Sequence, residues 1–200
     1  MDAYENFNRA PPEKQRAVLG AGFSCFARDG YKKTAMSEIA KTAGVSKAAL
    51  FHYFGSKHAL YQHLFHFSCR AIGSNVTPGG EDFFECIAHG IEIKTRTIAE
   101  YPGMYEFLLS ATRESGEISA EILREANAHF ITARAQTLFA NVHWAKLKAS
   151  VTPEEALAMV RWISDGYLRE NAWRTREEIV AGIRRYLDLL KTAIYKEEWQ

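Results

Sequence analysis

Apolar positions recur at helical spacing through most of the chain, and they do not alternate with polar ones as in a β-strand. The first such run lies between Pro12 and Gly30, with Glu13 near its start, an arrangement typical of the ends of a helix. A second run follows Ser56 and extends to about Ile72. The residues on the apolar face of the first run are Val18, Leu19, Gly22, Phe23, Phe26 and Ala27. The pattern predicts an all-α protein of about nine helices, preceded by a loose arm at residues 1–11.

Between these two runs, residues 36–55 predict two short helices joined by a tight turn. Gly44 suits the turn because glycine adopts the left-handed conformation that ends a helix without a steric penalty. Ser46 suits the N-cap of the second helix, where its hydroxyl can accept from a free backbone N–H. Ala40 is small enough to let the two helices cross closely. This is a helix-turn-helix motif, which places its second helix in the major groove of DNA.

The clearest break in the chain is the segment Asn75–Gly80, which is rich in glycine and ends the fourth helix. We therefore expect a DNA-binding domain at residues 12–72 and a separate helical domain at residues 80–197. The expected helices of the second domain are residues 81–100, 102–114, 118–146, 153–174 and 176–196.

Composition indicates a folded protein of the cytoplasm. The chain is 47% hydrophobic and 12% aromatic, enough for a sizeable core. No apolar run approaches the roughly 20 residues that span a bilayer, and the N-terminus lacks the features of a secretory signal, so no membrane association is expected. Cys25, Cys69 and Cys86 are scattered and odd in number, which favours reduced thiols.

The net charge of +1 hides an asymmetry along the chain. Residues 9–70 hold 10 Lys/Arg and 3 Asp/Glu, a balance of 10 − 3 = +7. Residues 71–200 hold 15 Lys/Arg and 19 Asp/Glu, a balance of 15 − 19 = −4, and the two acidic residues of segment 1–8 add −2. A basic first third attached to a mildly acidic remainder favours a nucleic-acid-binding head on a body with another task.

The second helix of the motif offers several side chains to a duplex. Its first turn holds Ser46, Lys47 and Ala48, and Lys47 can donate to guanine O6 or N7 while Ala48 allows close approach. Phe51 can meet a thymine methyl group or a sugar further along the exposed side. His52 and Tyr53 can donate to phosphates, although Tyr53 also suits the core. Double-stranded DNA is therefore the expected partner.

The segments TAMSEIA (34–40), AGVS (43–46), LFHYF (50–54) and SKHAL (56–60) resemble the N-terminal domain of TetR-type transcriptional regulators. The resemblance covers about residues 14–72. It implies phosphate contacts by Thr34 and Lys57, and a homodimer that binds a palindromic operator. It also implies a C-terminal body whose small-molecule effector changes the separation of the two heads, with release from DNA as the result. The expected function is that of a ligand-responsive repressor.

By the same resemblance, the last two helices form the dimer interface, and their apolar stripe also suits an ordinary bundle core. Its residues are Ile179, Ile183, Tyr186, Leu187, Leu190 and Ile194. Candidate effector contacts combine aromatic and polar side chains, as ligand pockets do. They are Met104, Tyr105, Phe107, Leu108, Phe130, Arg134, Trp162 and Asp165.

For the body, a second interpretation remains open. The body can dock a protein partner instead of a small molecule, in which case we expect a filled core and an exposed apolar patch. An enzyme is not expected, since the sequence lacks a phosphate-binding glycine loop, a G-x-S-x-G elbow and an H-E-x-x-H motif. His63, His66 and Cys69 are spaced three apart but lack a completing ligand, so no metal or other cofactor is expected.

Overall fold

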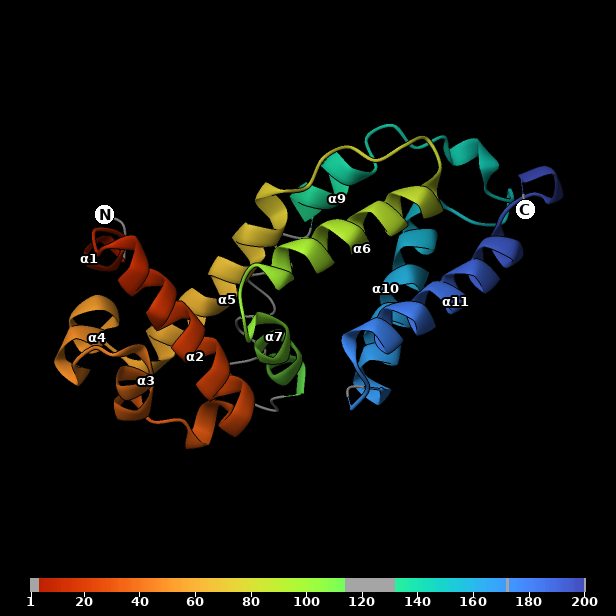
Figure 1. Cartoon of the computed structure of the whole chain (residues 1–200). Helices are drawn as coiled ribbons and strands as arrows, with labels where there is room; N and C mark the ends of the chain where they lie inside the picture. Colours follow the sequence, from red (N-terminus) through yellow and green to blue (C-terminus); the bar gives the residue numbers. More distant parts are fainter. Residues whose placement is uncertain (1–3, 114–131, 172, 200) are drawn as a thin grey trace. The chain divides into compact units, whose positions relative to one another are not determined.

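The computed structural model describes residues 4–113, 132–171 and 173–199, and these residues form α-helices and no strand. Figure 1 shows the helices in chain order. They are α1 (Glu5–Asn8), α2 (Pro12–Lys33), α3 (Met36–Ala43), α4 (Lys47–Phe54), α5 (Lys57–Ser74), α6 (Phe83–Ala99), α7 (Met104–Arg113), α9 (Thr132–Leu138), α10 (Pro153–Glu170) and α11 (Arg176–Ile194). The all-α prediction is confirmed.

The chain forms two compact units. The first contains α1–α5, the end of α6 and α7, and the second contains the start of α6 with α9, α10 and α11. The chain passes from the first to the second at Asn75–Val76, inside the break where the sequence analysis places the domain boundary. Residues 95–113 return to the first unit, which the break at residues 75–80 does not predict.

The helix-turn-helix motif forms as the sequence predicts. Gly44 ends α3 in the left-handed conformation (φ 65°), and its N–H donates to the carbonyls of Ala40 and Lys41. The Ser46 hydroxyl accepts from the Ala49 N–H at 3.0 Å and so caps α4. Both helices are only eight residues long and too short to be stable alone. Their position therefore depends on the helices around them.

The core of the first unit gathers one face from each surrounding helix. Ile39 of α3 and Leu50 of α4 are both 0% exposed, and α2 and α5 cover them with aromatic and aliphatic side chains. Helix α2 changes direction at Gly30, whose dihedral angles (φ 72°, ψ 171°) are not helical. This position agrees with the helix end predicted from the sequence, and residues 31–33 add one further turn.

Residues 1–11 were expected to form a loose arm, and for the described residues that expectation is wrong. Residues 5–8 form α1, and Phe7 on this helix is 2% exposed. The physical reason is that Tyr4 and Phe7, the aromatic residues of an otherwise polar stretch, lie three apart and share a helical face that the core of the first unit can bury.

Helix α7 belongs to the core of the first unit. Met104 and Phe107 are both 0% exposed. The Phe107 ring lies 5.3 Å from that of Phe23 on α2 and 5.2 Å from that of Tyr61 on α5. Gly103 begins the helix with φ 82°, which the close approach of the chain to Phe23 requires.

The second unit has its own core, formed around the pair α10 and α11 and the first turns of α6. Capping boxes begin both members of the pair, with Thr152 and Glu155 on α10 and Thr175 and Glu178 on α11. The buried carboxylate of Asp82 ties the unit together, since it accepts from Lys146 at 3.0 Å and from the Phe84 N–H at 3.0 Å.

The predicted helix at residues 118–146 is wrong at its C-terminal end. Its first part lies outside the described residues, and α9 ends at Leu138. Val142 is buried in the core of the second unit, and the His143 N–H donates to the Glu81 carbonyl at 2.9 Å. A continued helix would break both contacts, so packing against the start of α6 overrides the local helical pattern.

Candidate nucleic-acid interface

The first turn of α4 is exposed. Ser46, Lys47 and Ala48 all lie at the surface, and the Ser46 hydroxyl is turned back to cap the helix. Helix α4 carries no acidic residue, and its N-terminal N–H groups add a partial positive charge. The exposed end of α4 is therefore suited to approach a polyanion.

Lys47 and Phe51 lie one turn apart on the exposed side of α4. The Lys47 Nζ is 5.8 Å from the centre of the Phe51 ring, a weak cation–π contact that inclines the ammonium group along the helix. Phe51 is 40% exposed, unusual for a phenylalanine, and His52 beside it is exposed as well. Together they form one side of a helix that offers a charge, an apolar ring and an imidazole.

The opposite side of α4 faces the core. Leu50 and Phe54 are buried, and Tyr53 is half-buried with its ring 5.6 Å from that of Phe7. The Tyr53 ring therefore packs against α1, which fits the core role that the sequence left open for it.

Thr34, predicted to contact a phosphate, is 1% exposed. Its hydroxyl donates toward the Gly30 carbonyl at 2.7 Å and lies 3.2 Å from the Cys25 carbonyl. The side chain thus joins the end of α2 to the start of the motif. A phosphate contact by this hydroxyl does not fit its burial.

Lys57, the predicted phosphate clamp, is directed into the protein. Its Nζ donates to the carbonyls of Tyr31, Lys32 and Thr34 at 2.8, 3.2 and 3.1 Å, and it lies 4.6 Å from the centre of the Tyr31 ring. An ammonium group has three N–H donors, and three carbonyl oxygens accept them here. Lys57 therefore fixes the corner between α2 and α3, which the sequence could not indicate.

Arg28 pairs with two of the acidic residues of the head. Its guanidinium pairs with Asp29 at 2.7 Å and with Glu38, and these acids raise the pKa of Arg28 above its ordinary value. Asp29 and Glu38 are two of the three acidic residues among residues 9–70. Lys47 and the other exposed lysines of the head thus act with little opposing charge.

The candidate effector contacts occupy two kinds of environment. Met104 and Phe107 fill the core of the first unit, and Tyr105 and Leu108 pack partly buried against it. In the second unit, Trp162 on α10 is 64% exposed, and Asp165 is exposed as well. Phe130 and the side chain of Arg134 lie outside the described residues.

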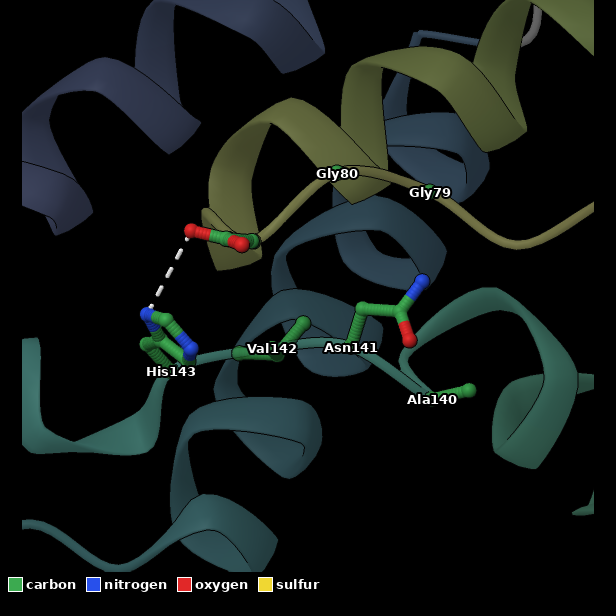
Figure 2. Close-up of a pocket in the computed structure, with 7 residues that line it drawn as sticks. Gly79, Gly80, Ala140, Asn141, Val142 and His143 are labelled. Carbon is green, nitrogen blue, oxygen red and sulfur yellow. Dashed lines mark ion pairs between the residues drawn. The ribbon is translucent and has the colours of Figure 1, made fainter.

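A pocket of about 400 Å³ does occur in the second unit, at a place that the sequence analysis did not consider. It lies between the segment of Gly79 and Gly80 and the segment that follows α9, and Figure 2 shows Asn141 and Val142 on the second of these segments. At one end, the Nδ1 of His143 is 3.5 Å from a carboxylate oxygen of Glu81. The described residues contain no cluster of three metal-binding side chains.

The predicted dimer stripe on α11 divides between the core and the surface. Ile179, Leu187 and Ile194 are buried in the second unit, and Ile183 and Leu190 pack partly buried beside them. Tyr186 is 49% exposed, and Leu189, which the sequence analysis did not single out, is 60% exposed. None of the described helices is long and apolar enough to cross a membrane.

Comparisons with known proteins agree with this geometry. The family model described as "Bacterial regulatory proteins, tetR family" matches residues 18–64. The regulator RutR of Escherichia coli K12 is 44% identical over 54 residues, which are 27% of this chain and 26% of RutR. The similarity to RutR thus spans about a quarter of that relative's length.

Other similarities extend over nearly the whole chain. The repressor AcnR of Corynebacterium efficiens is 22% identical over 194 residues, which cover 94% of this chain and 96% of AcnR. The structure of a TetR family transcriptional regulator from Chloroflexus aurantiacus superimposes with a TM-score of 0.61 at 17% identity, over 96% of this chain and 98% of that one. Fold and site define an all-helical protein with an N-terminal helix-turn-helix domain. The sequence of its N-terminal domain matches the TetR family of bacterial regulatory proteins, and its fold matches that of solved TetR-family regulators over nearly the whole chain.

Proposed function

We propose that this protein is a sequence-specific DNA-binding repressor of transcription that binds a palindromic operator as a homodimer. The observation that carries the proposal is the exposed side of α4, where Lys47 and Phe51 project from a helix without acidic residues. Lys47 would donate to a guanine, and Phe51 would contact a thymine methyl group on a neighbouring pair. The repressor assignment has its support in AcnR, which carries that description.

Of the groups predicted to contact phosphate, Thr34 and Lys57 do not take that role in this proposal. Thr34 and Lys57 are committed to backbone carbonyls, so we assign them to holding the motif in place. The exposed His52 and the N-terminal N–H groups of α4 remain available to phosphates. Ser46 contributes through its cap and Ala48 through its small size.

The homodimer has its support in the apolar side chains that α10 and α11 leave exposed. Trp162, Tyr186 and Leu189 are each about half exposed or more. The Tyr167 side chain of α10 lies against Gly182 of α11, and its ring is 5.6 Å from that of Tyr186, so α10 and α11 pack on each other. Such side chains are costly to leave in water, and a second copy of the same pair would cover them. Ile179, Leu187 and Ile194 would support this surface from within.

Release by a small molecule is the regulatory part of the proposal. It rests on the family alone, and we assign no effector contact to Met104 or Phe107, which fill a core. The alternative, a body that docks another protein, draws on the same exposed apolar residues as the dimer. If the homodimer buries these apolar residues, no exposed apolar patch is left on α10 and α11 for a protein partner.

The test is selection of binding sites from random duplexes by the purified protein at moderate salt, with Lys47→Ala in parallel. We expect a palindromic site whose half-sites lie about one helical turn apart or a multiple of it. Lys47→Ala should relax the preference at one position of each half-site, by about 1–3 kcal/mol if it removes a base contact. Salt-sensitive binding without an enriched site would refute the regulator assignment.

A further inference from the structure

The N-terminal segment, residues 4–10, packs behind the helix that would read DNA. We call it the N-terminal hook. It consists of Tyr4, the short helix α1 and the residues that lead to α2. Phe7, its central residue, is among the most buried side chains of the first unit. The hook lies outside the stretch that the TetR family model matches, residues 18–64.

Phe7 contacts the last turn of α4 and the middle of α5. Its ring centre lies 4.8 Å from that of Phe54, 5.6 Å from Tyr53 and 5.2 Å from His63. Tyr4 extends the same cluster, at 4.4 Å from His63 and 5.9 Å from Phe54. The hook thus covers the end of α4 that is opposite to Lys47.

Polar contacts hold the hook at both of its ends. The Tyr4 hydroxyl donates to the Ala59 carbonyl in the first turn of α5 at 3.3 Å. The side-chain amide of Gln15, on α2, donates to the carbonyls of Ala10 and Asn8 at 2.8 and 3.1 Å. Glu5 and Arg9 form an ion pair within the hook. The hook is therefore attached to α2 and α5, and Phe7 is pressed against α4 between them.

This arrangement matters because α4 has little hold of its own. It has eight residues, of which Leu50 and Phe54 are buried. Leu50 packs in the shared core, and Phe54 packs both against the hook and against His63 of α5. A helix held at two points pivots about one when the other is removed. Without Phe7 the Phe54 ring would keep its contact with α5 but lose its contact with the hook, so the last turn of α4 would be held less firmly and the direction of Lys47 would vary.

We propose that the hook is a positioning element for DNA recognition and that Phe7 is its positioning residue. Phe7 does not touch DNA in this proposal; it sets the orientation in which α4 presents Lys47 and Phe51. The proposal rests on the DNA-binding function proposed above. Loss of Phe7 lowers the fraction of heads with α4 in place, and apparent affinity falls in proportion to that fraction.

The experiment compares the wild-type protein with Phe7→Ala, Phe7→Leu and Asn6→Ala by two readouts. The first is amide hydrogen exchange of the free protein, resolved for residues 47–55 against α2. The second is affinity for the selected duplex. Asn6 is exposed on the same short helix and is the matched control. Phe7→Leu keeps an apolar side chain of similar reach and should restore most of both readouts.

We expect Phe7→Ala to speed exchange in α4 while α2 stays protected, and to weaken binding by about tenfold for each head. Asn6→Ala should match the wild type. Unchanged exchange in α4 overturns the proposal, as does faster exchange spread equally over α2, α3 and α4, which would make Phe7 a general core residue. Faster exchange in α4 with full affinity also overturns it. If the wild type binds no duplex, the regulator assignment fails, and the exchange data still decide whether the hook positions α4.

Discussion

Replacing Lys57 with methionine separates a structural role from a DNA contact. Methionine keeps the length and the apolar stem of the side chain but removes the ammonium group that the carbonyls of Tyr31, Lys32 and Thr34 accept. A hydrogen bond to a charged group contributes about 1.5–3 kcal/mol. The three bonds share one charge, and the Lys32 carbonyl lies near the surface, where water can replace the donor. We therefore expect a loss of about 2–4 kcal/mol in the free energy of unfolding.

For a chain of this size, 1 kcal/mol corresponds to about 2–4 °C in the unfolding midpoint. Thermal unfolding of the free Lys57→Met protein, followed by circular dichroism, should thus show a midpoint lower by roughly 4–16 °C. Lys47→Met is the matched control, since its exposed ammonium lies over the Phe51 ring. Such a surface change should alter the free energy of unfolding by at most about 0.5 kcal/mol.

The opposite result would restore the phosphate clamp. In that case Lys57→Met would melt like the wild type, bind DNA more weakly for every sequence, and lower the slope of log affinity against log salt by about one. Lys47→Met separates the two roles again, because it should relax sequence preference without any change in melting. Unchanged melting of Lys57→Met would refute the structural role that the three carbonyl contacts assign to this lysine.

Three further predictions concern the second unit and the turn. Burial works against ionisation of Asp82, yet the hydrogen bond from Lys146 and the Glu85 N–H hold its pKa below the ordinary 3.8. The ionised Asp82 therefore stabilises the folded state at pH values above 3.8, the ordinary pKa of an aspartate. This stabilisation is lost as the pH falls through the lower pKa that Asp82 has in the folded state. Asp82→Asn should remove this part of the acid sensitivity in unfolding curves recorded from pH 6 to 2, and an unchanged curve would contradict it. Leu189→Arg should be a monomer in light scattering, with unchanged helicity in circular dichroism. The control Glu154→Arg, at an exposed position of α10, should remain a dimer. A dimeric Leu189→Arg protein would exclude the exposed apolar surface of α10 and α11 as the dimer interface. Gly44→Ala should lower the free energy of unfolding by about 1–2 kcal/mol in denaturant titrations, because φ is 65° at this position. No neighbour lies within 4 Å of the added Cβ, so backbone strain is the whole cost. An unchanged free energy of unfolding would show that the turn relaxes.

The helix-turn-helix motif could be predicted because its signals are local. Gly44 and Ser46 specify the end of one helix and the start of the next within three positions, and the structure places both as expected. The all-helical class follows from apolar spacing in the same way. What decides these features lies within one or two turns of each residue.

The remaining features depend on partners far along the chain. Phe7 is buried by residues 53, 54 and 63, and nothing within residues 1–11 indicates that these will lie beside it. The role of Lys57 depends on carbonyls about 25 positions earlier, and a sequence does not show where a carbonyl points. The end of α9 is set by the contact of His143 with Glu81. Two of these features left a local signal in the sequence. The three-residue spacing of Tyr4 and Phe7 could have indicated the short helix α1, and the adjacent Arg28 and Asp29 could have indicated an ion pair.

Phe7 and Lys57 act at opposite ends of the same motif, and a double-mutant cycle can test whether they act separately. Lys57 is bonded to the corner before α3, at residues 31–34, while Phe7 packs on the end of α4 and on α5. If the corner and the hook are independent supports, the losses in the free energy of unfolding for Phe7→Ala and Lys57→Met should add within about 0.5 kcal/mol. A larger coupling energy would mean that the two supports form one unit, with α4 and the corner moving together. Additive losses would leave α4 able to move while the corner stays fixed, which is the property that the proposed role of the hook requires.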